Sequence, residues 1–127
     1  MTIPINRSFD VAGVAPFTET FSINGGLVLG TGTLRFYFTR AVTIDNVRAS
    51  VGTAPTGAAI IIDVNKNGTT IFTTQGNRPQ IAVSTNTDTS NVPDVTAFAA
   101  GDYLTVDVDQ IGSTIAGADL TVQIEYE

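Results

Sequence analysis

The sequence contains no cysteine, no histidine and no tryptophan, and only 14% of its residues are charged. Without cysteine the chain cannot form a disulfide. Without histidine it lacks the commonest general base and the commonest transition-metal ligand. Twelve acidic residues outnumber six basic ones, and the formal net charge is −6. Because nucleic acids are polyanions, we expect no nucleic-acid partner. No apolar run approaches the roughly 20 residues of a membrane-spanning helix, so we expect no membrane partner.

The 127 residues correspond to one domain, and a chain of this length can bury a core without disulfides or metals. Apolar and polar side chains alternate with a period of two along several short segments, which predicts β-strands. About eight short strands separated by turns are typical of an all-β antiparallel β-sandwich, and we expect a jelly-roll arrangement. The cleanest alternation predicts one core that contains Leu104, Val106, Val108, Leu120, Val122 and Ile124.

Turn-forming residues separate the predicted strands. Asn67-Gly68 predicts a type I′ hairpin, because both residues tolerate the positive φ angles that this turn requires. At Asp45-Asn46 the alternation changes parity, which indicates a turn or a β-bulge. Residues 85–93 are expected to form a long polar loop. The predicted strands are residues 17–23, 34–39, 41–51, 58–64, 69–73, 80–84, 95–98, 103–109 and 120–126.

Residues 1–16 precede the first clear strand and are expected to form an N-terminal arm, whereas residues 17–127 form the sandwich domain. The arm carries scattered apolar residues among proline, glycine, asparagine and arginine, and such a segment cannot bury these side chains by itself. One interpretation is a frayed terminus. The other is an assembly arm that docks on a neighbouring subunit through Ile3, Ile5, Phe9 and Val11.

Residues 63–68, with the sequence DVNKNG, match the first half of a calcium-binding loop. Asp63, Asn65 and Asn67 would be its ligands. The twelfth position of such a loop needs a bidentate glutamate, but here it is Thr74. A strand that ends in an Asn-Gly hairpin explains the same residues, and we expect no metal.

Asp107 and Asp109 lie two residues apart on one predicted strand and therefore share a face. Such a pair could supply the acid and base of a glycosidase or help to hold a cation. Alternation alone also places both carboxylates on a solvated face, which is the simpler interpretation. We expect no catalytic residue and no cofactor.

Three segments of the chain carry a resemblance to known proteins: residues 52–72 (GTAPTGAAIIIDVNKNGTTIF), 77–82 (NRPQIA) and 99–126 (AAGDYLTVDVDQIGSTIAGADLTVQIEY). They resemble a β-rich module of virion proteins of tailed bacteriophages, which is often found at the C-terminal end of tail or fibre proteins. The resemblance implies a structural role in the virion, and no catalytic residue of the family maps onto this chain. Only about fifty residues precede the module here, whereas a tail fibre usually has a long shaft there.

This short layout favours a capsid decoration (cement) protein, made in the host cytoplasm and located on the virion. Its expected partners are other copies of itself, as a homotrimer by the resemblance, and the major capsid protein or other virion proteins.

The alternative is a tail-fibre or head-fibre tip that binds a glycan or protein of the host surface. Loops on a rigid sandwich commonly carry recognition, and the candidate residues are Gln75, Asn77, Arg78, Asn86, Asp88 and Asn91. A small glycan hydrolase is a third class, and it rests only on Asp107 and Asp109.

Overall fold

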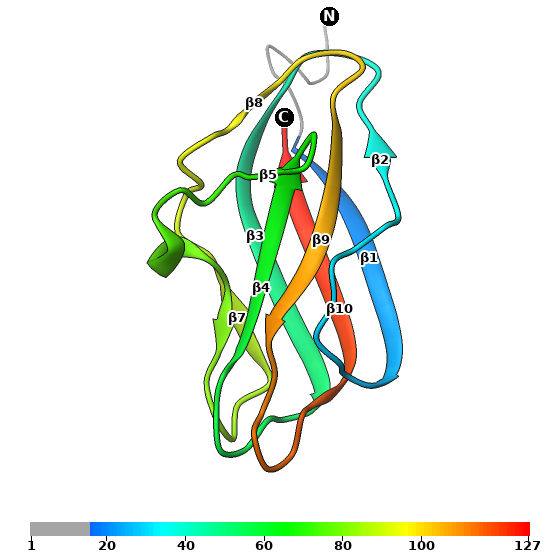
Figure 1. Ribbon diagram of the computed structural model, residues 1–127. Helices are drawn as coiled ribbons and strands as arrows, with labels where there is room; N and C mark the ends of the chain where they lie inside the picture. Colours follow the sequence, from blue (N-terminus) through cyan, green and yellow to red (C-terminus); the bar gives the residue numbers. More distant parts are fainter. Residues whose placement is uncertain (1–15) are drawn as a thin grey trace, which may run out of the picture.

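The computed structural model describes residues 16–127, which form two antiparallel sheets packed face to face (Figure 1). The first sheet contains, in order, β1 (Phe17–Gly26), β10 (Ala118–Tyr126), β3 (Val42–Thr53) and β7 (Thr87–Thr89), and β8 (Ala97–Phe98) also pairs with β3. The second contains β2 (Phe36–Tyr37), β9 (Tyr103–Gln110), β4 (Ile60–Lys66) and β5 (Thr69–Thr70), and β6 (Gln80–Ile81) pairs with β4. One 3₁₀ turn, η1 (Gln75–Asn77), precedes β6. Within residues 16–127, no helix is long and apolar enough to cross a membrane.

The strand order is that of a jelly roll. The chain changes sheets at each step from β1 to β4, and again from β6 to β7, from β8 to β9 and from β9 to β10. The first described strand pairs with the last, and β3 lies between β10 and β7. Two interleaved sheets with this order are the double-sheet jelly-roll arrangement. The expected all-β sandwich is therefore confirmed.

Apolar side chains from the inner faces of both sheets form one core. Of the six residues predicted to lie in it, five are buried, and Val106 is only half-buried. Val106 packs against this core as predicted, but the prediction of full burial was wrong, because its side chain also lines an open groove. Fully buried residues with large side chains include Ile44, Ile60, Ile62, Ile71, Phe72, Ile81, Phe98, Leu104, Leu120 and Ile124.

Two local features follow the sequence closely. In the pairing of β10 with β3, Glu125 is opposite Asn46 and Tyr126 is opposite Ile44, so Asp45 is an extra residue in β3 and forms a bulge. At the end of β4, Asn67 and Gly68 have φ angles of 50° and 89°, as a type I′ hairpin requires. The parity change and the hairpin are both confirmed.

The strand expected at residues 34–39 is reduced to the two residues of β2. Six residues separate Gly30 from Phe36, but their partners in β9, Val108 and Leu104, are only four residues apart. The excess residues cannot stay in the ladder, so the chain between Gly30 and Phe36 leaves the regular pairing, although Gly32 still contacts β9 through the Asp107 side chain.

The region expected to be a long polar loop, residues 85–93, contains β7, which pairs with residues 48–50 of β3. This strand has no apolar alternation because it lies at the edge of its sheet and two of its three residues are exposed. Its polar side chains serve the fold instead: the Thr87 hydroxyl donates to the Ala49 carbonyl at 3.0 Å.

Candidate interaction surface

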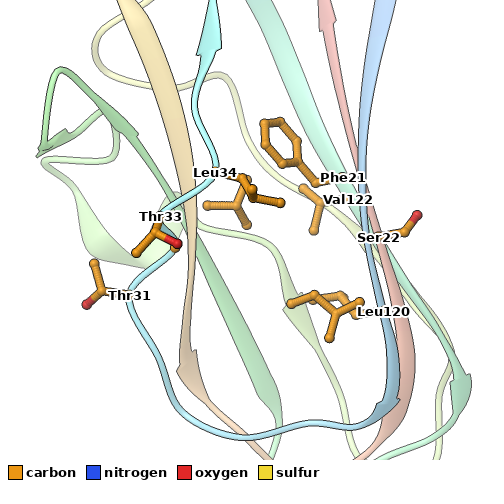
Figure 2. A pocket seen from close by; sticks show the side chains of 10 residues that line it. Phe21, Ser22, Thr31, Thr33, Leu34, Leu120 and Val122 are labelled. Atoms are coloured by element: carbon orange, nitrogen blue, oxygen red, sulfur yellow. The ribbon is translucent and has the colours of Figure 1, made fainter.

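An apolar groove opens between the two sheets on the side of the molecule where β1 and β2 lie (Figure 2). Its volume is about 230 Å³. One wall is β1, the other is the chain segment 31–34, and the floor comes from β9 and β10. Figure 2 shows the side chains of Phe21, Leu34, Leu120 and Val122 directed into this space. The apolar lining residues are Phe21, Ile23, Leu34, Val106, Leu120 and Val122.

The groove exists because β1 is an edge strand of the first sheet. It pairs with β10 on one side, and among residues 16–127 no strand pairs with its other side. Phe21 is opposite Val122 and Ile23 is opposite Leu120, so the odd-numbered side chains of β1 face the interior. Ile23 is nevertheless 43% exposed. The inner face of β1 is therefore open to solvent.

Exposed apolar side chains are concentrated in the part of the chain that contains β1, β2 and their connection, and two of them, Ile23 and Leu34, line the groove. In the described chain, nine large hydrophobic residues are exposed, and six of them fall within residues 17–37. Val28 and Leu34 are each 73% exposed. Exposed apolar patches of this kind mark binding surfaces more often than isolated exposed residues do. Tyr37 is opposite Tyr103 and therefore lies on the outer face of the second sheet, so we give the name β1–β2 patch to the other five residues: Phe17, Ile23, Val28, Leu29 and Leu34.

Two arginine side chains in this part of the chain stack on aromatic rings. Arg35 donates from Nη1 to the Tyr37 hydroxyl at 2.9 Å, and its guanidinium lies 4.2 Å from the ring centre of Tyr103. The guanidinium of Arg40 lies 4.8 Å from the ring centre of Phe17. Tyrosine and arginine are enriched among the residues that contribute most to protein interfaces. Both residue types therefore stand beside exposed apolar residues of this region, as they often do in protein-binding surfaces.

The half-matched calcium motif lies elsewhere, at the end of β4, and its side chains point to different partners. The Asp63 carboxylate accepts from the Thr70 hydroxyl at 2.7 Å and from the Val64 amide at 2.8 Å. Asp63 is buried, and this burial raises the pKa of its carboxyl group. Asn67 instead contacts the start of β9. Within residues 16–127, no three histidine, cysteine, aspartate or glutamate side chains are placed to hold a metal ion.

Asp107 and Asp109 lie on the outer face of β9, and each has its own structural partner. The Asp107 carboxylate accepts from Asn65 Nδ2 at 2.7 Å and from the Gly32 amide at 2.9 Å. Asp109 forms an ion pair with Arg78 at 2.7 Å. These contacts connect β9 to Asn65 of β4, to Gly32 in the connection before β2 and to Arg78 in the connection before β6.

The two loops that were candidates for recognition meet at Asn77 and Asn91. The Asn91 backbone amide donates to the Asn77 carbonyl at 3.1 Å, and the Asn91 side-chain amide donates to Asn77 Oδ1 at 3.0 Å. Gln75 donates to the carbonyl of Phe72 at 2.7 Å. Arg78 donates from Nε to the carbonyl of Gln75 at 2.9 Å. The loops therefore form one ordered corner, and these polar groups bind within the chain.

The remaining two candidates stabilise the neighbouring strands. The Asn86 side chain donates to the carbonyls of Val51 and Gly52, at 2.9 Å and 3.4 Å. The Asp88 carboxylate accepts from the Gln80 amide at 2.8 Å. The other candidates, Ile3, Ile5, Phe9 and Val11 of the arm, lie outside the described residues. Sequence reasoning missed the β1–β2 patch, although Val28 and Leu29, two apolar residues outside any predicted strand, were a signal for it.

No protein-family model matches the chain, and no curated protein matches it. Several solved chains are weakly similar to it, and two of them are described here. The catalytic unit of the thermostable GH87 α-1,3-glucanase from Streptomyces thermodiastaticus strain HF3-3 has a TM-score of 0.42 and 18% identity over 88% of this chain. A chain in the structure of infectious bursal disease virus, Gx strain, has a TM-score of 0.38 and 11% identity over 98% of this chain. This chain spans 24% of the length of the first and 37% of the second. At these scores the two likenesses identify neither a family nor a function.

Proposed function

We propose that this protein is a non-enzymatic structural component of a tailed-bacteriophage virion, and specifically a capsid decoration protein. It acts by associating with copies of itself and by attaching to the particle surface. The observation that carries this proposal is the β1–β2 patch: exposed apolar residues lie on β1 and on the connection that follows it, and two of them, Ile23 and Leu34, line an open groove. The resemblance of residues 52–126 to virion modules of tailed bacteriophages supports the choice of particle.

The physical argument concerns the cost of leaving this patch in water. Phe17, Ile23, Val28, Leu29 and Leu34 are each between 43% and 73% exposed. Burying the exposed part of such a side chain contributes roughly 1 kcal/mol. Many modest contacts of this size, repeated by the symmetry of a particle, add through multivalency. A decoration protein needs this kind of surface and no reactive group.

The proposal is tested by counting copies in purified particles of the source virus. Quantitative mass spectrometry with the major capsid protein as internal standard gives the ratio directly. A decoration protein is present in hundreds of copies per particle. A handful of copies would instead indicate a fibre tip, and complete absence from the particle would refute any structural role in the virion.

A second test uses substitutions in the β1–β2 patch. Because Val28 and Leu34 are each 73% exposed, changing them to aspartate leaves the core intact and makes the patch polar. We expect the double variant V28D/L34D to keep its β-sheet circular dichroism but to lose particle binding. The matched control is V92D: Val92 is 66% exposed in the connection between β7 and β8, and these two strands lie on the side of the sandwich away from β1 and β2 (Figure 1). Equal binding by the patch variant and the control would contradict the proposal.

A further inference from the structure

We infer that the groove beside β1 receives the N-terminal segment of a second copy of this chain, residues 3–9, as an added antiparallel strand. This inference rests on one part of the proposed function, the association of copies with one another, and it names the segment that links one copy to the next. It does not depend on which particle the protein decorates.

The first support is the free edge of β1. This strand is ten residues long, and in the described chain only β10 pairs with it. A long strand edge with free backbone donors and acceptors is a template for another strand. Binding by strand addition joins backbone hydrogen bonds with side-chain pockets at alternate positions. The groove supplies such a pocket, because it lies under Phe21 and Ile23 on the inner face of β1.

The second support is the match between the two sequences. Ile3, Ile5 and Phe9 have the same parity, as do Phe17, Phe21 and Ile23 in β1. Residues directly opposite each other in an antiparallel pair share a face of the sheet. In the register that places residue 5 opposite Phe21, residue 3 is opposite Ile23 and residue 9 is opposite Phe17. Two isoleucine side chains then enter the groove above Val106, Leu120 and Val122.

Charge complementarity selects this register. Glu19 is the only charged residue of β1, and its position in the ladder, opposite Ile124, places it on the inner face. The register described above puts Arg7 directly opposite Glu19. Opposite charges across a strand pair are stabilising, and like charges are destabilising. Pro4 fits this arrangement because the added segment becomes the new edge strand, where proline is tolerated.

The extent of the exposed patch indicates a second copy as the source of the segment. Val28 and Leu29, in the connection after β1, are exposed beyond the groove itself, and one added strand along β1 cannot cover them. A second folded copy that delivers its segment also brings a surface to this side of the sandwich. Each copy has one segment and one groove, so the contact can close in a symmetric oligomer.

The absence of cysteine allows a direct test. A tagged chain with Ile3→Cys is co-expressed with an untagged chain with Ile23→Cys, and the purified, reduced protein is treated with a short bis-maleimide. We expect a covalent heterodimer on a denaturing gel. The control replaces Ile23→Cys with Val92→Cys, which is also exposed and should give no heterodimer above background. The double variant I3C/I23C distinguishes the source: cross-linking confined to single chains would show that each segment folds back onto its own β1, and would overturn the inference.

The register has a test of its own. Arg7→Glu or Glu19→Arg alone places like charges opposite each other, and each should weaken self-association roughly fivefold, as measured by sedimentation equilibrium. The double charge swap should restore the association. If neither single variant changes the association, or if the swap does not rescue it, this pairing is wrong.

The two proposals can fail separately. If the cross-linked heterodimer forms but the protein is absent from particles, the proposed function is refuted, whereas the inferred addition of residues 3–9 to β1 of a second copy is supported. If the protein is abundant on particles but gives no cross-link between copies, the proposed function is supported and the inferred strand addition is refuted.

Discussion

Asn67 offers the sharpest test of how the hairpin between β4 and β5 stabilises the sandwich. Its backbone is held at a φ of 50°, a region that asparagine tolerates better than other residues with a side chain. Its Oδ1 accepts from the Tyr103 amide at 3.0 Å, and its Nδ2 donates to Asp102 Oδ1 at 2.9 Å. The same residue therefore shapes the turn and fastens it to the start of β9.

Two substitutions separate these roles. Asn67→Gly removes both side-chain hydrogen bonds but keeps the backbone conformation accessible. The bond to Tyr103 alone is worth about 1 kcal/mol, and glycine costs a further 0.5–1 kcal/mol, approximately, through the entropy of the unfolded chain. Asn67→Ala removes the same bonds and adds roughly 1–2 kcal/mol for the left-handed conformation. We expect losses of about 2 kcal/mol for the glycine variant and about 3 kcal/mol for the alanine variant.

Thermal melts followed by circular dichroism can resolve this order. For a domain of this size 1 kcal/mol shifts Tm by roughly 4 °C, so the glycine variant should melt above the alanine variant and both well below the parent protein. Equal Tm values for the two variants would show that the positive φ carries no cost. Parental Tm values for both would show that the hydrogen bonds to β9 contribute nothing.

The same variants should change the response to acid. The hydrogen bond from Asn67, more than the nearby Lys66 ammonium, lowers the pKa of the Asp102 carboxyl. A carboxyl whose folded pKa is depressed stabilises the fold above its unfolded pKa, near 4, and this contribution is lost as pH falls through the folded pKa. The destabilisation caused by either variant should therefore be smaller at pH 2 than at pH 7. A constant difference in Tm between these two pH values would contradict this assignment.

Three further predictions follow from other parts of the structure. From the alternation alone, Val106→Asp would be expected to unfold the domain. Because Val106 is half-buried in an open groove, the new carboxylate can reach water, and the variant should keep its β-sheet circular dichroism. Gel filtration should show weakened self-association, and complete unfolding would contradict the open groove. Asp63→Asn should raise Tm at pH 7, because burial raises the pKa of the Asp63 carboxyl and its ionisation above the usual pKa, near 4, then costs stability. The gain in Tm should vanish below about pH 4. A lower Tm at pH 7 would show that the fold needs the negative charge. Chelator or added calcium should leave Tm unchanged, because Thr74 replaces the bidentate glutamate of a calcium loop; a shift of several degrees would reopen the question of a metal site.

Features that depend on neighbours in the chain could be predicted from the sequence. The alternation of Leu120, Val122 and Ile124 placed these residues in the core, because the side-chain period of a strand is two whatever its partner is. The hairpin at Asn67-Gly68 and the bulge at Asp45 were equally local, since each depends on the φ angles or the parity of a few consecutive residues. These local rules were enough to identify an all-β sandwich.

Features that depend on the partner strand were decided only by the tertiary structure. β2 is short because the spacing of Gly30 and Phe36 does not match that of their partners in β9, and β7 is a strand because β3 offers it an edge. Val106 continues the alternation of β9, yet it is half-buried because it lines the open groove between β1 and the chain segment 31–34. The pattern of one strand says which way a side chain points. Whether another layer covers that side chain depends on strand order, which arises from contacts between residues far apart in the chain.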